Sequence, residues 1–206
     1  MKTEQYTATE LIEKSKHSKH NEEFEIFPEP GYELIDNFIP KDALKKIQNT
    51  LLYDNAFPWM RSHNVAWPDS VNDDVTPEYL SYFSHILFGN YGKYDNVNSI
   101  LSDYFEEFFG TLLDNTFPIK SLLRMKANLY PYTETLWEHA PHTDYSFPHI
   151  LGVFYVNTCD GYTKLHDGTK IDSIENRMLL IDGSKLHSST TTSNAKVRVT
   201  IGMNWL

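Results

Sequence analysis

The sequence predicts a mainly β protein with helices, of the α+β class, in which a β-sandwich or barrel carries helices on its outside. Two observations support this prediction. Apolar residues recur at helical spacing in the first half of the chain, whereas short segments with strand patterns, separated by glycines, follow Pro118. Because helices come first and a run of short strands follows, we expect the helices to cover a β core.

The composition indicates one folded domain with an acidic surface. The chain has 206 residues, of which 40% are hydrophobic and 14% aromatic, and a formal net charge of -10. Its length favours one domain over two, and we place that domain at residues 24–206, after a flexible or helical segment at residues 1–23. The charge disfavours nucleic acid as a partner, because nonspecific binding to phosphate backbones depends on Lys and Arg.

The cysteine content and the N-terminal sequence are used to predict the cellular compartment. Cys159 is the only cysteine, so neither an internal disulfide nor a cysteine-based zinc site can form. No apolar signal core follows Met1, and no apolar run reaches the length of a membrane span. We therefore expect a cytoplasmic protein without a membrane partner.

The first half of the chain predicts one strand and three helices. A turn after Pro28 leads into a strand that ends near Asp36. Trp59 and Trp67 lie in an irregular stretch, where we expect them to act as packing anchors. The helices are expected from Pro40 to about Leu52, at about 78–88 and at 97–114.

The second half predicts strands, and its last strand has two different faces. Met125, Ala127 and Leu129 alternate with polar residues at a period of two. Further strands are expected at 150–156, 178–181 and 196–205. In the last of these, one face is apolar and suited to pack against helices, and the other holds four residues that we expect to line a cavity: Arg198, Thr200, Gly202 and Asn204.

His142 and Asp144 are candidate metal ligands. Residues i and i+2 of an extended segment point to the same side, so both side chains can reach one ion while Thr143 points away. His187 on a neighbouring strand would complete two histidines and one carboxylate, the facial triad of non-haem Fe(II) oxygenases. His-x-Asp alone is a weak signal, and the alternative is that His142 is a hydrogen-bond donor in a loop.

Arg198 is a candidate anion ligand on the cavity face. A buried arginine needs a partner, which is either an Asp or Glu of the chain or the carboxylate of a bound dicarboxylate. Beside the two histidines, a co-substrate that bridges metal and arginine is the better account, and the Thr200 hydroxyl can add a hydrogen bond. Tyr130 either bonds the same carboxylate or packs with its hydroxyl satisfied elsewhere.

Several motifs together resemble the Fe(II)/2-oxoglutarate-dependent oxygenases, most closely the prolyl 4-hydroxylase-like branch with its small bacterial and phage-type members. The resemblance covers about residues 30–206, beginning with the segment Tyr32–Pro40. The motifs are Asn128-Leu-Tyr-Pro, His142-Thr-Asp144, Phe154-Tyr-Val-Asn157, Asp160-Gly-Tyr, Asp167-Gly-Thr, Asn176-Arg-Met, His187 and Arg198-Val-Thr.

This resemblance implies a fold and a set of site residues. The fold is a double-stranded β-helix, or jelly roll, with the N-terminal helices packed on its outside. The implied iron ligands are His142, Asp144 and His187. The implied 2-oxoglutarate-binding residues are Arg198, which anchors the distal carboxylate, with Thr200, Tyr130 and Asn128.

The resemblance also implies a reaction class, in which O2 and 2-oxoglutarate give succinate, CO2 and a hydroxylated product. The substrate is a peptidyl or prolyl residue, a free amino acid or a small metabolite. Arg198 stands where collagen-type prolyl hydroxylases have lysine, and Tyr132 replaces the usual glycine, so prolyl specificity is not implied. Asp144 stands where related halogenases have a small residue, which favours hydroxylation.

Two other functions stay open at this point, and four residues are candidate substrate contacts. A non-catalytic jelly-roll module could bind a sugar or small acid, and a nucleobase oxygenase would share the chemistry, although the charge disfavours it. Trp137 and His139 lie in a loop before the metal motif, where Trp137 could instead serve loop packing. Asn157 and Arg124 complete the set, and the alternative for Arg124 is a solvated strand face.

Overall fold

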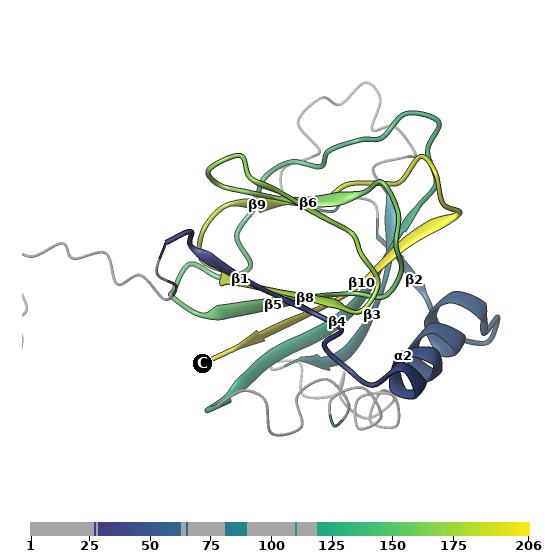
Figure 1. The fold of residues 1–206 in the computed structure, drawn as a ribbon, viewed down its shortest axis with the longest axis horizontal. Helices are drawn as coiled ribbons and strands as arrows, with labels where there is room; N and C mark the ends of the chain where they lie inside the picture. Colours follow the sequence, from purple (N-terminus) through teal and green to yellow (C-terminus); the bar gives the residue numbers. More distant parts are fainter. Residues whose placement is uncertain (1–26, 28, 63–64, 66–80, 90–109, 111–118) are drawn as a thin grey trace, which may run out of the picture.

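The computed structural model describes residues 27, 29–62, 65, 81–89, 110 and 119–206, and they form two facing antiparallel sheets (Figure 1). The larger sheet has the strand order β1-β8-β5-β10-β4-β3-β2, and the smaller has the order β7-β6-β9. The larger sheet consists of β1 (Tyr32–Asp36), β2 (Met60–Ser62), β3 (Tyr82–Gly89), β4 (Leu122–Pro131), β5 (Ile150–Tyr155), β8 (Arg177–Asp182) and β10 (Val197–Trp205). The smaller consists of β6 (Tyr162–Leu165), β7 (Lys170–Asp172) and β9 (His187–Ser188).

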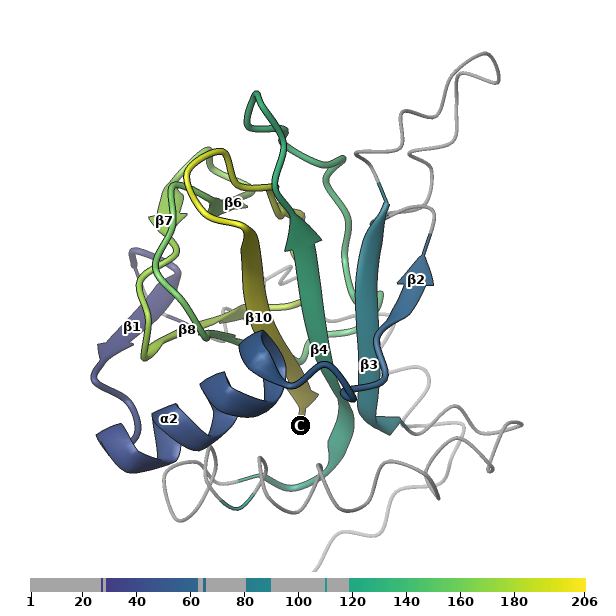
Figure 2. The same ribbon diagram turned by 90° about the vertical axis from the view of Figure 1, so that its right-hand side faces the viewer.

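The outer face of the larger sheet is covered by the helix α2 (Lys41–Gln48), which continues into the π-helical turn η1 (Asn49–Tyr53) (Figure 2). Leu44, Ile47 and Leu51 from this segment join one hydrophobic cluster with the outward residues of β10. These are the alternating apolar residues Val197, Val199, Ile201, Met203 and Trp205, which the sequence pattern assigned to a helix-covered face. Burial of this stripe holds α2 against the sheet.

A second hydrophobic cluster lies between the two sheets. Leu151, Val153 and Tyr155 of β5 point inward with Leu179 and Ile181 of β8. They meet residues of the smaller sheet, namely Leu165 and Ile171. Both faces of β5 and β8 are therefore buried, which explains why these strands read as continuous apolar runs rather than as alternation. The sandwich fits the predicted jelly-roll core.

One prediction was wrong: residues 78–88 are not a helix over their described part, because Tyr82–Gly89 forms strand β3. This strand pairs with β4, with Phe83 opposite Leu129 and Ile86 opposite Lys126. Its aromatic and β-branched residues favour a strand. Because both of its faces carry apolar residues, the period of two that marks a half-exposed strand is missing from the sequence.

The other predicted elements have different outcomes. The strand that ends at Asp36, the helix after Pro40 and the four strands of the second half are all confirmed. Trp59 packs against Phe57 with ring centroids 4.8 Å apart, as expected of an anchor. Residues 1–23, Trp67 and the helix at 97–114, apart from Gly110, lie outside the described residues. Within the described part of the chain, no helix has the length and apolarity needed to cross a membrane.

Candidate metal centre and co-substrate cavity

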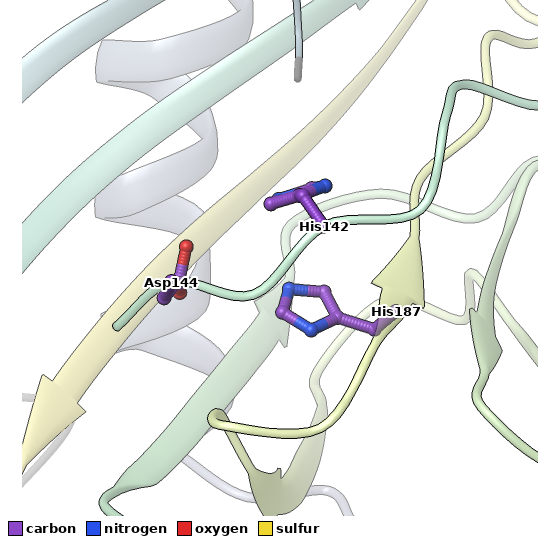
Figure 3. Close-up of side chains that lie close together, drawn as sticks. All are labelled: His142, Asp144 and His187. Atoms are coloured by element: carbon purple, nitrogen blue, oxygen red, sulfur yellow. The ribbon is translucent and has the colours of Figure 1, made fainter. Parts of the chain in front are cut away.

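His142, Asp144 and His187 lie together between the two sheets (Figure 3). Each side chain offers one ligand atom, and these atoms all lie within 4.8 Å of one another. Two reciprocal backbone hydrogen bonds of 3.0 and 2.9 Å pair His142 with His187 at the start of β9. This pairing keeps the segment extended, so Thr143 is exposed while its two neighbours point inward.

The two imidazoles are oriented by backbone carbonyls. Nδ1 of His187 lies 3.1 Å from the Lys185 carbonyl oxygen, and Nδ1 of His142 lies 3.5 Å from that of Ala140. Because a carbonyl only accepts, each Nδ1 is the donor, and each Nε2 keeps its lone pair for a metal. Burial and the nearby His187 lower the pKa of His142 to about 4, so its ring is neutral and able to coordinate at neutral pH.

Asp144 is held by two residues of the larger sheet. The Arg124 guanidinium forms an ion pair with it at 2.6 Å, and Asn204 Nδ2 donates to its other oxygen at 2.8 Å. Arg124 Nε also donates to Asn204 Oδ1 at 3.1 Å, which closes a three-membered network. Although burial alone would raise the pKa of Asp144, Arg124 and His187 hold it well below its ordinary value. Asp144 is therefore ionised and is a candidate metal ligand.

Arg198 reaches the same cavity from β10 and is 1% exposed. Its guanidinium donates to the Thr190 carbonyl at 3.3 Å and to Thr163 Oγ1 at 3.2 Å, while its Nε has no partner. Among the described residues, no Asp or Glu forms an ion pair with it. The alternative that Arg198 pairs with a carboxylate of the chain therefore finds no support, and a buried cation faces a cavity without a counter-ion.

The remaining predicted co-substrate residues lie beside Arg198. Across the β4–β10 ladder, Tyr130 is opposite Arg198 and Asn128 is opposite Thr200. All four line the cavity, and Asn128 Oδ1 is buried without a hydrogen-bond partner. The Arg198 guanidinium carbon lies 5.2 Å from the Tyr130 ring centroid, and burial raises the pKa of Tyr130. The two unsatisfied atoms, Arg198 Nε and Asn128 Oδ1, suit a ligand that has a carboxylate to accept from the arginine and a donor or a water to bond the asparagine oxygen.

Sequence reasoning missed three residues around Arg198. Tyr155 packs its ring 5.7 Å from the guanidinium carbon and donates to Thr163 Oγ1 at 2.8 Å, and burial raises its pKa to about 12. A Cβ at Gly161 would come within 2.5 Å of Arg198 Cδ, so only glycine leaves room for the arginine. Tyr155 and Gly161 fall inside the motifs of the resemblance, but their sequence spacing does not reveal the contact.

Of the four candidate substrate contacts, only Arg124 lines the cavity. His139 is 2% exposed, contacts Ser189 Oγ at 2.9 Å and packs against the Tyr130 ring. Trp137 is 41% exposed, and Asn157 bonds the backbone of Val197 and Val199 at the start of β10. The ligand cluster found among the described residues does not include His139.

The cavity has a volume of about 60 Å³ and opens to the solvent. The donor set of two imidazoles and one carboxylate fits Fe(II) and leaves coordination positions open. Arg198 at the other end of the cavity fits the distal carboxylate of a dicarboxylic acid.

Comparisons with known proteins identify the fold. No protein-family model matches the sequence, and no curated protein matches it. Among solved structures, a Trichoplax adhaerens prolyl hydroxylase in complex with a hypoxia inducible factor peptide fragment is similar, with a TM-score of 0.53, 17% identity and coverage of 85% of this chain and 83% of that one. A Pseudomonas putida prolyl-4-hydroxylase has a TM-score of 0.53, 11% identity and coverage of 85% and 92%.

A third similar structure widens the group beyond prolyl hydroxylases. It is an oxidoreductase of the 2OG-Fe(II) oxygenase family from Burkholderia pseudomallei, with a TM-score of 0.51, 12% identity and coverage of 86% of this chain and 84% of that one. All three identities are low, and the likeness is one of fold. The chain has the fold of the 2OG-Fe(II) oxygenases, and of their prolyl hydroxylase-like branch.

Proposed function

We propose that this protein is an Fe(II)- and 2-oxoglutarate-dependent dioxygenase that hydroxylates a small-molecule or peptidyl substrate. One observation carries the proposal: a buried arginine without a carboxylate partner among the described residues opens into the same cavity as two histidines and an aspartate. A jelly-roll module that only binds a sugar has no need of this combination.

In the proposed reaction, His142, Asp144 and His187 hold the iron, and Arg198 with Thr200 binds the distal carboxylate of 2-oxoglutarate. When bound, the iron and the co-substrate supply the oxidising chemistry, in which 2-oxoglutarate, O2 and R–H give succinate, CO2 and R–OH. The presence of Asp144, where related halogenases have a small residue, favours hydroxylation over halogenation.

The chain's own residues position these groups. Arg124 and Asn204 fix both carboxylate oxygens of Asp144, so the ligand keeps one orientation through binding. The Tyr130 and Tyr155 rings flank the Arg198 guanidinium and keep water away from it, which strengthens its interaction with an anion. A peptidyl substrate is one of the two proposed classes, and a structure of similar fold holds a peptide fragment.

The test is spectroscopic and then catalytic. Under anaerobic conditions, Fe(II) plus 2-oxoglutarate should produce a weak visible charge-transfer band, and His187→Ala should remove it. On admission of O2, succinate should form with a stoichiometric loss of 2-oxoglutarate. A folded wild-type protein that shows no band at saturating Fe(II) and 2-oxoglutarate would disprove the proposal.

A further inference from the structure

Lys126 is a cationic side chain in the cavity that the proposed chemistry does not use. It lies on β4 between Arg124 and Asn128, and all three line the cavity. Its side chain is half-buried, and among the described residues no carboxylate forms an ion pair with it. Its one hydrogen bond to the described residues runs from Nζ to the Tyr82 hydroxyl at 3.3 Å.

In the loaded site, no negative charge balances the positive charge of Lys126. Fe(II), Arg198 and Arg124 together bring four positive charges, and the two carboxylates of 2-oxoglutarate with Asp144 bring three negative charges, so no negative charge remains for Lys126. Imidazole ligands bind metal in their neutral form, so they add none. Arg124 is already paired with Asp144 at 2.6 Å. In a chain of net charge -10, a cation that faces an internal cavity without a counter-ion indicates an anion that is still to bind.

The strand order places this anion to one side of the co-substrate, because Tyr82 belongs to β3, on the other side of β4 from β10. Arg198 is opposite Tyr130, whereas Lys126 is four residues further along β4, opposite Gly202. Gly202 has no side chain, and a Cβ built there would meet nothing nearer than 3.8 Å, at Asn128 Nδ2. The space over Gly202 is therefore open, and it leaves room for a co-substrate that extends from Arg198 to the metal ligands.

Lys126 and Tyr82 form a pair of donors. The Tyr82 hydroxyl accepts from Lys126 Nζ, so its own proton is directed elsewhere. The lysine also stands over the tyrosine ring, with Nζ 5.3 Å from the ring centroid, which restricts its movement. Two donor atoms 3.3 Å apart match the two oxygens of one carboxylate.

We propose that Lys126 and Tyr82 bind a carboxylate of the primary substrate beside the metal centre. The substrate is then a small carboxylic acid, such as a free amino acid, rather than an internal residue of a peptide. This proposal rests on the proposed function, because it assigns Arg198 to the co-substrate and the metal to His142, Asp144 and His187.

The test uses small probes on the protein loaded with Fe(II) and saturating 2-oxoglutarate without O2. Acetate carries the carboxylate, inorganic phosphate carries a different oxyanion, and acetamide is the neutral match of acetate. We expect acetate to shift the visible band saturably without loss of its intensity, and acetamide to leave it unchanged. With O2 present, free amino acids should stimulate succinate release more than their primary amides do.

The variants assign the effect to Lys126. Lys126→Met should raise the dissociation constant of acetate about 10- to 100-fold, the equivalent of one lost charge-assisted hydrogen bond. Lys126→Arg should keep acetate binding within about threefold, because the charge remains. Tyr82→Phe should weaken acetate binding less than Lys126→Met does. The matched control is Lys120→Met, since Lys120 is exposed and does not line the cavity.

Three results would overturn the proposal. The first is acetate binding that Lys126→Met leaves unchanged, and the second is a phosphate response stronger than that of acetate, which assigns the site to another oxyanion. The third is a Lys126→Met protein in which the 2-oxoglutarate dissociation constant rises, because Lys126 would then serve the co-substrate. A wild-type protein that shows no visible band would instead contradict the proposed function. The failure of one proposal can therefore be distinguished from the failure of the other.

Discussion

Arg198 illustrates how a single residue links folding to ligand binding. Its guanidinium is 1% exposed and has hydrogen bonds to a carbonyl and a hydroxyl, but no counter-ion among the described residues. Burial of a charge without an opposite charge opposes folding, because hydrogen bonds replace only part of the lost hydration. A bound carboxylate removes this penalty, so the residue stabilises the loaded protein more than the empty one.

Replacement of Arg198 by methionine should therefore separate binding from stability. We expect Arg198→Met to raise the dissociation constant of 2-oxoglutarate about 10- to 100-fold, from the loss of a charge-assisted interaction of roughly 1.5–3 kcal/mol. The thermal midpoint of the empty protein should not fall, because methionine has no charge to bury. Anaerobic titration of the visible band and calorimetry of the empty protein measure the two effects.

The control for this variant is Arg61→Met, which removes an exposed arginine on β2. It should leave both the 2-oxoglutarate dissociation constant and the thermal midpoint unchanged, since exposed charges contribute little. Equal 2-oxoglutarate affinity in Arg198→Met and the wild type would show that the co-substrate is not anchored at Arg198.

Among the elements, β10 connects the core to the site. Its outward residues pack under α2, and its inward residues extend from Arg198 to Asn204, which is fully buried. Asn204 Nδ2 donates to Asp144 and also lies 3.2 Å from His149 Nε2. Because His149 Nδ1 contacts the Phe147 carbonyl at 2.8 Å and so donates, its Nε2 accepts the second Asn204 proton. One amide thus fixes the orientation of the candidate metal ligand Asp144.

Asn204→Ala should loosen Asp144 and weaken iron binding. Loss of a group that orients a metal ligand typically lowers metal affinity about 10- to 100-fold. We expect a rise of this size in the Fe(II) dissociation constant, measured by competition with a chelator. Thr143→Ala is the control, because Thr143 lies between two ligands but is exposed, so its loss should leave iron affinity unchanged. An Asn204→Ala protein with wild-type iron affinity would remove Asn204 from the site.

Strand β3 carries a titratable residue outside the site. His85 is 1% exposed, and its Nδ1 lies 2.9 Å from the Pro58 carbonyl oxygen, which ties the segment before β2 to the sheet. Burial lowers the pKa of His85 below its ordinary value of 6.5. The folded state thus favours the neutral ring, and the stability that His85 contributes is fully present above pH 6.5 and is lost as the pH falls below it.

His85→Asn should make the protein less sensitive to acid. Asparagine keeps a donor near the Pro58 carbonyl but has no ring to protonate. The thermal midpoint should therefore fall less between pH 7 and pH 5 in this variant than in the wild type, as followed by circular dichroism. His166→Asn changes an exposed histidine and should keep the wild-type slope. Parallel curves for His85→Asn and the wild type would assign the acid sensitivity to other groups.

The strands show what periodicity alone can predict. β4 and β10 were predictable because each has one apolar and one polar face, so their period of two is explicit. β3 was not, because aromatic side chains cover both of its faces and its apolar run also fits a helix. The strand assignment depends on pairing with β4, which is a long-range contact that no local pattern contains.

The site residues also differ in how far the sequence alone predicts their contacts. The grouping of the candidate ligands was predictable because part of their geometry is local: the extended His142-Thr143-Asp144 segment determines where two side chains point. Asn157 was not, because the structure alone reveals that its amide binds the backbone at Val197 and Val199 rather than a ligand. Likewise, the ion pair of Arg124 with Asp144 depends on how the segment crosses the larger sheet.

At the scale of the whole molecule, we expect residues 24–206 to form a single domain with the oxygenase fold. Phe27 is the first described residue and already packs against the outer core. Removal of residues 1–23 should therefore leave the thermal midpoint and the Fe(II)–2-oxoglutarate band unchanged, because no core contact described here is lost. A fall of several degrees in the midpoint, or loss of the band, would show that the segment belongs to the domain.

Residues of both sheets form the site around the cavity, and this affects how the two sheets separate. His187 lies on β9 and Thr163 on β6 of the smaller sheet, whereas Arg198, Arg124 and Asn204 belong to the larger one. Iron and 2-oxoglutarate, bound together, would act as a removable cross-link in a chain whose single cysteine permits no internal disulfide. Loading should slow the opening of the sandwich, seen as slower amide hydrogen exchange in β6 and β9, and chelation should reverse it.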